Sequence, residues 1–267
     1  MIVDGRNIAE AVCANIRIDV GLLSRAPHLT IISCAPTPET ERYLALKEKK
    51  AALVGIVTEV LRFGATMTTE EMVAASTDAK ERADGIIVQL PLPATIDTHR
   101  VLAAIPPTHD VDALNPQTTT MLSPVVGAIH EILLTHGITA TGKNVTIIGS
   151  GKLVGLPAQR WFTEQGAHVS VVTKDTPDIG YYTRTADIIV CGAGVPGLLT
   201  PDMVKEGVVI LDAGTSEDGG VLRGDADPSC AEKASLFTPV PGGIGPLTIA
   251  ILLRNVLDCA MKRESVL

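Results

Sequence analysis

Short apolar runs alternate with amphipathic segments along the first part of the chain. Apolar runs at 29–35, 55–63 and 84–93 have the length and β-branched content of buried strands. The segment after the first run shows helical spacing of apolar residues, and so does 68–83, which opens with threonine followed by acidic residues. Strands that alternate with helices in this way are typical of a parallel sheet.

The same alternation returns in the second half of the chain. The pattern predicts a strand at 143–148, a glycine turn at 149–155, a helix at about 156–165 and a strand at 168–173. Two further apolar runs, ADIIVC and GVVILD, end in glycine-containing turns, and an apolar helix follows a glycine-rich loop at the end. The polar, proline-bearing segment 106–124 separates the two halves, so we expect two α/β domains.

Composition narrows the class of protein. The 267-residue chain has a formal net charge of -8 and no basic stripe with interleaved aromatic residues, so no nucleic-acid partner is expected. We see no uninterrupted apolar run of the roughly 18 residues that span a bilayer, so no membrane partner is expected either. The five scattered cysteines and the isolated histidines lack zinc-site spacing, which predicts reduced thiols in a cytoplasmic protein and no metal site.

Tyr43 and Lys47 stand one helical turn apart in the stretch RYLALKEKKAALVGI. Side chains at i and i+4 lie on one face of a helix, so the ring and the amine are expected to be neighbours. The spacing alone fits two interpretations, a solvated lysine beside a half-buried ring and a catalytic pair. The solvated interpretation suits Lys49 and Lys50 nearby, and the rest of the sequence has to decide for Lys47.

The glycine turn in IIGSGKLVG has glycines at 149, 151 and 155 between an apolar strand and a helix. This spacing is one residue longer than the usual dinucleotide fingerprint, but its context favours a nucleotide site over a plain structural turn. The next strand ends at Thr173, Lys174 and Asp175. A basic residue there suits the phosphate of NADP, whereas an acidic one suits the ribose of NAD, so this position leaves the preference open.

Several motifs occur in one order: the Tyr43/Lys47 pair, DGIIVQLPLP, DVDALN, the glycine turn with KLVGLP, ADIIVCGAGVPG and PVPGGIGPLT. Together they resemble the bifunctional methylenetetrahydrofolate dehydrogenase/methenyltetrahydrofolate cyclohydrolase family over essentially the whole chain. The resemblance implies two α/β domains with the active site in a cleft between them. Residues 1–122, completed by the helix 245–267, would form the folate-binding catalytic domain, and 123–244 the Rossmann-like NAD(P)-binding domain.

The resemblance also implies an activity. Members of this family oxidise 5,10-methylenetetrahydrofolate with NADP and hydrolyse the methenyl product to 10-formyltetrahydrofolate. NADP is therefore the expected cofactor, with NAD as the alternative, and a folate is the expected substrate. The family further implies a homodimer paired through the nucleotide domain, with a place in one-carbon metabolism and purine biosynthesis.

Four residues carry the implied chemistry. Lys47 would transfer the proton in the hydrolysis, Tyr43 would orient its amine and pack against the substrate, and Gln89 would hydrogen-bond Lys47. Asp112, the second acid of DVD, would hold the pterin ring. Further substrate contacts are implied for Leu90, Pro91, Pro241, Gly242, Gly243, Gly245 and Pro246. Cofactor contacts are implied for Gly149, Ser150, Gly151, Val154, Thr173, Lys174, Gly192, Ala193, Gly194 and Thr215.

The sequence departs from the family pattern at several places. It reads MLSP where a Pro-Cys-Thr-Pro stretch is common, Ser150-Gly151 where Arg-Ser is common, and Thr215 where an isoleucine is usual. Ala113 replaces the glycine after Asp112, and Asp84 stands where a histidine is frequent. A member that keeps one of the two activities is therefore an alternative. A non-catalytic folate- or nucleotide-binding protein and an unrelated NAD(P) dehydrogenase are others, which the retained Lys47, Gln89 and VQLPLP disfavour.

Overall fold

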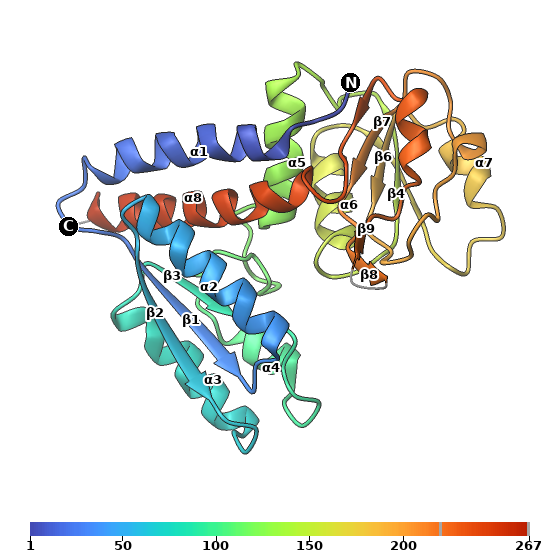
Figure 1. Ribbon diagram of the computed structural model, residues 1–267. Coiled ribbons are helices and arrows are strands. Elements are labelled where there is room, and N and C mark those ends of the chain that lie inside the picture. Colours follow the sequence, from blue (N-terminus) through green and yellow to red (C-terminus); the bar gives the residue numbers. More distant parts are fainter. Residues whose placement is uncertain (219–220, 266–267) are drawn as a thin grey trace. The chain divides into compact units, whose positions relative to one another are not determined.

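The computed structural model describes residues 1–218 and 221–265. The chain divides into two compact units, each with its own parallel sheet (Figure 1). The three-stranded unit contains residues 10–124 and those from 249 onward, and the five-stranded unit contains residues 1–9 and 125–248. The fold class expected from the sequence, two α/β domains with parallel sheets, is confirmed.

The three-stranded unit has the strand order β2-β1-β3, with all neighbours parallel. Its central strand is buried from Leu29 to Cys34, which explains the continuous apolar run in the sequence. Ile32 and Ile86 pack in one core cluster with Met72 of a covering helix. The elements are β1 (His28–Cys34), α2 (Pro38–Leu53), β2 (Val57–Phe63), α3 (Thr69–Asp78), β3 (Gly85–Val88) and α4 (Thr98–Ala103), with a 3-10 turn at Ala79–Glu81.

The five-stranded unit has the strand order β10-β7-β6-β4-β5, with all five strands parallel. From β4 the chain first moves to β5 on one side and then to β6 on the other, so the direction of winding reverses between β4 and β6. Such a reversal opens a crevice at the carboxyl ends of the two strands, where α/β proteins bind ligands.

The elements of the five-stranded unit follow the expected alternation, with several additions. They are α5 (Pro124–Thr135), β4 (Asn144–Ile148), α6 (Gly155–Glu164), β5 (His168–Val172), α7 (Ile179–Thr183), β6 (Ile188–Cys191), β7 (Val209–Asp212) and β10 (Leu236–Phe237). An antiparallel ribbon joins β8 (Ser216–Asp218) to β9 (Val221–Arg223), and 3-10 turns lie at Pro201–Met203 and Pro228–Glu232. Two helices contribute to both units, α1 (Gly5–Val20) and α8 (Ile244–Glu264).

The first residues of the chain lie in the five-stranded unit, whereas the motif-based division placed them in the first domain. The amide of Val3 donates to the carbonyl of Phe237 at 2.9 Å, and the amide of Phe237 donates to the carbonyl of Met1 at 2.9 Å. The amide of Gly5 donates to the carbonyl of Gly242, also at 2.9 Å. The chain start thus extends the β10 edge of the sheet, a long-range pairing that the local sequence does not signal.

Helix α8 begins at Ile244, one residue before the expected start at 245. Gly245 and Pro246 therefore lie in its first turn, where proline fits because the first amides of a helix have no intrahelical partner. Arg254 and Asp258 interrupt the apolar residues of α8, but this helix is long and apolar enough to cross a membrane by length and composition. Of its most apolar window, 67 % is buried inside the protein, as in the core helix of a water-soluble fold.

Candidate active site

Lys47 lies on the inward-facing side of α2. This helix begins at Pro38 because the Thr37 side chain accepts a hydrogen bond from the amide of Thr40 at 3.2 Å. Thr40, Leu44 and Ala51 are its buried residues, and Lys47 lies on the same helical stripe, partly buried. Lys49 is exposed. The solvated interpretation therefore applies to Lys49, whereas Lys50 is partly buried, as Lys47 is.

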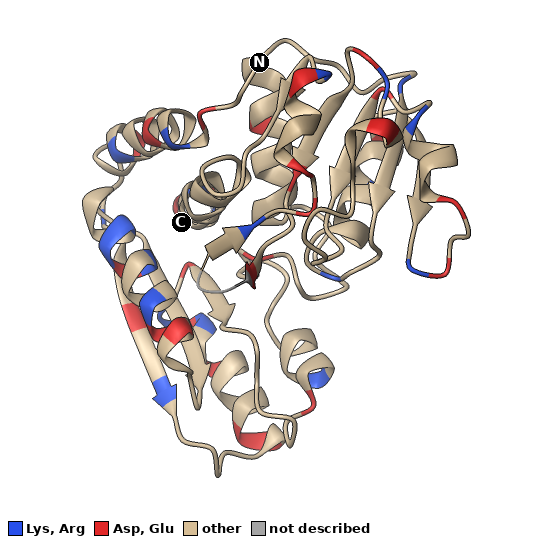
Figure 2. Ribbon diagram, turned by 45° about the vertical axis from the view of Figure 1, so that its right-hand side comes forward, with Lys and Arg blue, Asp and Glu red and all other residues tan. Residues whose placement is uncertain are grey.

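Charges on α2 are mixed in sign. Figure 2 shows Lys and Arg along this helix together with Glu. Arg62 of β2 pairs with Glu41 at 3.3 Å and with Glu48 at 3.8 Å. The helix therefore presents paired charges and no continuous basic face.

Gln89 fixes the position of the Lys47 amine. It follows β3, where its backbone amide donates to the carbonyl of Ile32 at 2.8 Å. Its side-chain nitrogen donates to the carbonyl of Leu90 at 2.8 Å, which directs the side-chain oxygen towards α2. This oxygen accepts a hydrogen bond from Lys47 Nζ at 2.9 Å. The VQLP motif thus supplies a donor-acceptor pair that orients one lysine.

Asp112 reaches the same region because its segment runs beside β3. Ile86 and Asp110 form an isolated parallel bridge, and the chain turns directly after it, where the amide of Ala113 donates to the carbonyl of Asp110 at 3.2 Å. Burial raises the pKa of the Asp112 carboxyl, and the nearby Lys47 ammonium opposes this rise. The two charges are therefore coupled, and the carboxyl and the amine share one site.

The first acid of DVD has a different role from the second. Asp110 is buried and accepts hydrogen bonds from the amide of Asn115 and the hydroxyl of Thr118, each at 2.7 Å. These bonds close the loop that follows Asp112. Asp110 therefore holds the loop in place, and Asp112 is left half-buried and accessible to a ligand.

Ala113 has left-handed backbone geometry, with φ at 52°. Glycine adopts this conformation without strain, whereas alanine does not. Ala113, which replaces the family's glycine after Asp112, therefore keeps a backbone conformation that favours glycine.

Tyr43 and the residues after Gln89 line the outer part of this site. Tyr43 is 50 % exposed, one helical turn before Lys47. Leu90 is partly buried, Pro91 is exposed, and the Leu90–Pro91 peptide bond is cis. The structure brings Lys47, Gln89, Leu90 and Asp112 together in the three-stranded unit, and Tyr43 lies one helical turn from Lys47.

The five-stranded unit holds the second candidate site, the glycine turn after β4. Gly149 has φ at 101°, and a Cβ on it would lie 2.6 Å from the carbonyl oxygen of Gly192. A Cβ on Gly155 would lie 2.2 Å from the carbonyl oxygen of Gly149. Within the described residues the amides of Ser150, Gly151 and Lys152 donate no hydrogen bond. With the N-terminus of α6 directly behind them, these amides fit the pyrophosphate of a dinucleotide.

The turn after β6 is bound by a carboxylate of the same unit. The amides of Ala193, Gly194 and Val195 donate to the Asp225 carboxylate at 2.6, 3.1 and 2.8 Å. Cofactor contacts are implied for Gly192, Ala193 and Gly194, and the amides of Ala193 and Gly194 already have a partner in Asp225. Asp225 was not singled out from the sequence, and a single acid more than 30 positions along the chain gives no local signal of this contact.

Asp212, at the end of β7, holds the backbone on both sides of Asp225. Its carboxylate accepts the amides of Gly214 at 2.9 Å, Asp225 at 3.2 Å and Ala226 at 2.8 Å. Burial raises the pKa of Asp212 to about 6, and the Asp225 charge adds to the rise, although the three amides act against it. An acid at the carboxyl end of a strand was the available signal for this residue.

The remaining predicted cofactor residues lie near the same end of the sheet. Thr173 follows β5, where its hydroxyl accepts the amide of Asp175 at 3.3 Å and its own amide donates to the Thr176 hydroxyl at 3.0 Å. Lys174 and Thr215 are exposed, and Val154 is partly buried against Gly192. Lys174 is therefore accessible, and it follows the strand after the glycine turn, where proteins of this fold bind the ribose phosphate of NADP.

The PVPGGIGP segment forms a tight turn in the five-stranded unit. Gly242 has φ at 110°, and the amide of Gly243 donates to the carbonyl of Pro239 at 2.7 Å. A Cβ on Gly5 would lie 1.8 Å from the carbonyl oxygen of Gly243. Pro241 follows a cis peptide bond. The turn is thus closely packed on the beginning of α1.

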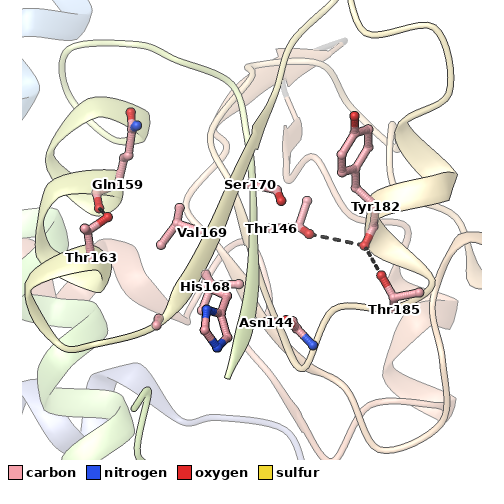
Figure 3. Close-up of a pocket in the computed structure, with 11 residues that line it drawn as sticks. Asn144, Thr146, Gln159, Thr163, His168, Val169, Ser170, Tyr182 and Thr185 are labelled. Atoms are coloured by element: carbon pink, nitrogen blue, oxygen red, sulfur yellow. Dashed lines mark hydrogen bonds between the residues drawn. The ribbon is translucent and has the colours of Figure 1, made fainter. Parts of the chain in front are cut away.

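A pocket of about 490 Å³ lies along the edge strand β5, away from these residues. Figure 3 shows Gln159 and Thr163 of α6 on one side of β5, and Tyr182 and Thr185 on the other. No residue predicted for the active site lines it. Among the described residues no group of three or more His, Cys, Asp or Glu side chains is placed to hold a metal ion.

These features define a class of protein, a two-unit α/β fold with a Lys-Gln-Asp cluster in one unit and a dinucleotide-type glycine turn in the other. Residues 3–112 match the catalytic domain of the tetrahydrofolate dehydrogenase/cyclohydrolase family, and residues 123–264 match its NAD(P)-binding domain. The chain belongs to the tetrahydrofolate dehydrogenase/cyclohydrolase family, which confirms the resemblance inferred from its motifs.

Relatives match over nearly the full length. The bifunctional protein FolD of Aliarcobacter butzleri is 36% identical over 280 residues, covering 99% of this chain and 98% of that protein. The crystal structure of the bifunctional enzyme FolD from Campylobacter jejuni has a TM-score of 0.95 at 32% identity, covering 98% of this chain and 99% of that chain. The Trypanosoma brucei enzyme, complexed with NADP cofactor and inhibitor, has a TM-score of 0.92 at 32% identity, covering 98% of each chain.

Proposed function

We propose that this chain oxidises 5,10-methylenetetrahydrofolate to the 5,10-methenyl form with NADP, and hydrolyses the methenyl form to 10-formyltetrahydrofolate. Membership of the family and near full-length similarity to bifunctional relatives support both activities. The observation that carries the assignment in this chain is the 2.9 Å hydrogen bond from Lys47 to Gln89 with Asp112 beside it.

In the hydrolysis we assign proton transfer to Lys47. Water adds to the methenyl carbon, the bond from that carbon to N5 breaks, and N5 takes up a proton while the carbon becomes the formyl group on N10. Gln89 holds the amine of Lys47 in place, and the partly buried position of Lys47 keeps bulk water from replacing it. Asp112 would accept hydrogen bonds from the N–H groups of the pterin, and Tyr43 would pack against the ring.

In the oxidation the protein's task is to position the two reactants. NADP, when bound, would supply the acceptor for the hydride that leaves the methylene carbon. The residues that fit this cofactor are the free amides of the Gly149 turn for the pyrophosphate and the accessible Lys174 for the ribose phosphate. The exposed Lys174 supports NADP, whereas the exposed Asp175 next to it would support NAD.

We further propose that the enzyme is a cytoplasmic homodimer whose formyl product serves purine biosynthesis. The free state of all five cysteines supports a reducing compartment. The edge strand β5 supports pairing between copies, since an edge exposes unpaired backbone groups and the polar pocket runs along it. Sedimentation of the purified protein measures the oligomeric state directly.

The experiment that tests the hydrolysis compares Lys47→Met with Lys49→Met. Both variants remove one lysine from α2, but Lys49 is exposed and serves as the matched control. Hydrolysis of methenyltetrahydrofolate, followed by absorbance, should fall at least about 100-fold in Lys47→Met and stay unchanged in Lys49→Met. Persistent hydrolysis in a folded Lys47→Met protein would remove Lys47 from the mechanism.

The oxidation is tested by mixing the protein with methylenetetrahydrofolate and either NADP or NAD. Faster reduction of NADP supports the proposal, and faster reduction of NAD contradicts the role given to Lys174. Hydrolysis without reduction of either cofactor would indicate a cyclohydrolase that has lost the first activity at its changed glycine turn.

A further inference from the structure

We infer that Asp225 is a positioning residue for the nucleotide site: its buried carboxylate fills the ring of amides after β6 and so fixes the wall opposite the Gly149 turn. The inference deepens the proposed function and rests on it. Asp225 is 0 % exposed, while Ala193, Gly194 and Val195, whose amides it accepts, are exposed. A surface turn is thus held from inside by one charge.

The three amides form a concave anion site. Gly194 has φ at 69°, and a left-handed residue within a turn can direct successive N–H groups to a common point. Here the point is occupied by two carboxylate oxygens, with amide distances of 2.6, 3.1 and 2.8 Å. Hydrogen bonds from three amides to a buried carboxylate are short and strong because the acceptor is charged. A cofactor phosphate cannot enter this ring, since it would meet a negative charge already in place.

The position of this turn explains why it matters for the cofactor. β4 and β6 are neighbours, and the crevice between their carboxyl ends is the place where this fold binds a dinucleotide. The two turns that wall it are in close contact, because a Cβ on Gly192 would lie 2.5 Å from Val154 Cγ1. Movement of the turn after β6 would therefore displace Val154, at the start of α6, and with it the amides of the Gly149 turn.

The surroundings of Asp225 are built to keep it in place. Asp212 accepts the amide of Asp225 at 3.2 Å. Two glycines leave room for the pair: a Cβ on Gly214 would lie 2.2 Å from Asp225 Cγ, and one on Gly224 would lie 2.1 Å from an Asp212 oxygen. The pyrophosphate is therefore restricted to the Gly149 turn, while the turn after β6 contributes shape and no phosphate contact.

The test uses Asp225→Ala and Asp225→Asn in the full chain, with Asp227→Asn as the matched control. Asp227 lies two residues further on, is partly buried and accepts hydrogen bonds from Ser229 without reaching the turn after β6. We expect the KM for NADP to rise about tenfold or more in both Asp225 variants, because charged hydrogen bonds are lost. Hydrolysis of methenyltetrahydrofolate, which needs no NADP, should stay within about twofold of wild type if the fold is intact.

Chemical rescue separates positioning from mere stability. Formate can supply a carboxylate to the empty amide ring of Asp225→Ala, so it should lower the KM for NADP towards the wild-type value, whereas chloride at equal ionic strength should not. An unchanged KM in the Asp225 variants overturns the inference, and so does a raised KM that formate leaves unaltered. If wild-type protein reduces neither NADP nor NAD, the proposed function itself has failed.

A further variant, Gly194→Ala, changes the backbone of the turn and leaves the carboxylate in place. It has open space for the new Cβ, but it strains the left-handed backbone that aligns the amides. It should raise the KM for NADP in the same direction as the Asp225 variants. Wild-type affinity for NADP in Gly194→Ala would contradict the inference even if neither Asp225 variant folds.

Discussion

Lys47 donates a hydrogen bond to Gln89 at 2.9 Å, although the two residues are 42 positions apart and lie on different elements. The bond links the inward stripe of α2 to the end of β3. It converts a lysine that would otherwise be mobile into a group with a fixed direction, and it places the amine where the Asp112 carboxyl responds to its charge.

Loss of the Gln89 side chain should therefore reduce hydrolysis more than oxidation. In Gln89→Leu the amine loses its acceptor, and we expect kcat for methenyltetrahydrofolate hydrolysis to fall about 100-fold while the KM for NADP stays unchanged. Gln117→Leu is a control at an exposed glutamine of the same unit. Equal losses in both variants would argue against a specific role for the Lys47–Gln89 bond.

The two acids of DVD should respond differently to substitution. Asp112→Ala should raise the KM for folate strongly with little change in thermal stability, because this carboxyl faces the proposed ligand. Asp110→Ala leaves the amide of Asn115 and the hydroxyl of Thr118 without their acceptor, so it should lower the free energy of unfolding by about 2–3 kcal/mol. Thermal melting and steady-state kinetics on both variants give the comparison, and a reversed pattern would exchange the two assignments.

Ala113→Gly should stabilise the protein. Alanine at φ of 52° carries left-handed strain of about 1–2 kcal/mol, which exceeds the extra entropy of an unfolded glycine, about 0.4–1 kcal/mol. A rise in melting temperature of about 2 °C is expected, with unchanged kinetics. Ala104, at φ of -84°, is the control, since glycine there gains nothing and should lower stability. A lower melting temperature for Ala113→Gly would show that strain is not the dominant effect.

The raised pKa of Asp212 predicts a pH dependence of stability. Its folded pKa of about 6 exceeds the reference 3.8, so folding favours the protonated form. The contribution is full below pH 3.8 and is lost as the pH rises through 6. Between these values wild type should lose about 3 kcal/mol relative to Asp212→Asn. Denaturant unfolding of both proteins across this range measures the difference, and parallel curves would contradict the raised pKa.

The fold was predictable where local pattern and burial coincide. β1 and β6 are buried along nearly their whole length, and their sequences are continuous apolar runs. The run at 84–93 ends as a strand at Val88, because the prolines that follow cannot donate to a sheet. β10 has two residues and gives no periodicity, so it was not expected.

The candidate site was predictable in a different way. Helical spacing related Tyr43 to Lys47, but the hydrogen bond of Lys47 to Gln89 and the role of Asp112 were implied by the resemblance of whole motifs. Neither helical spacing nor the motifs predict the role of Asp225. Its partners belong to a turn that precedes it by some thirty residues, and its neighbours in sequence show no pattern. Contacts between a side chain and distant backbone amides leave no trace in local sequence.

The pairing of the chain start with β10 also bears on how the protein is made. A ribosome releases Met1–Val3 long before Phe237, the residue to which they bond. The three-stranded unit likewise includes residues from 249 onward, which are synthesised long after residues 10–124. Neither unit can reach its final form before the residues of α8 have been synthesised. A chain truncated shortly before α8 should therefore leave both units incomplete.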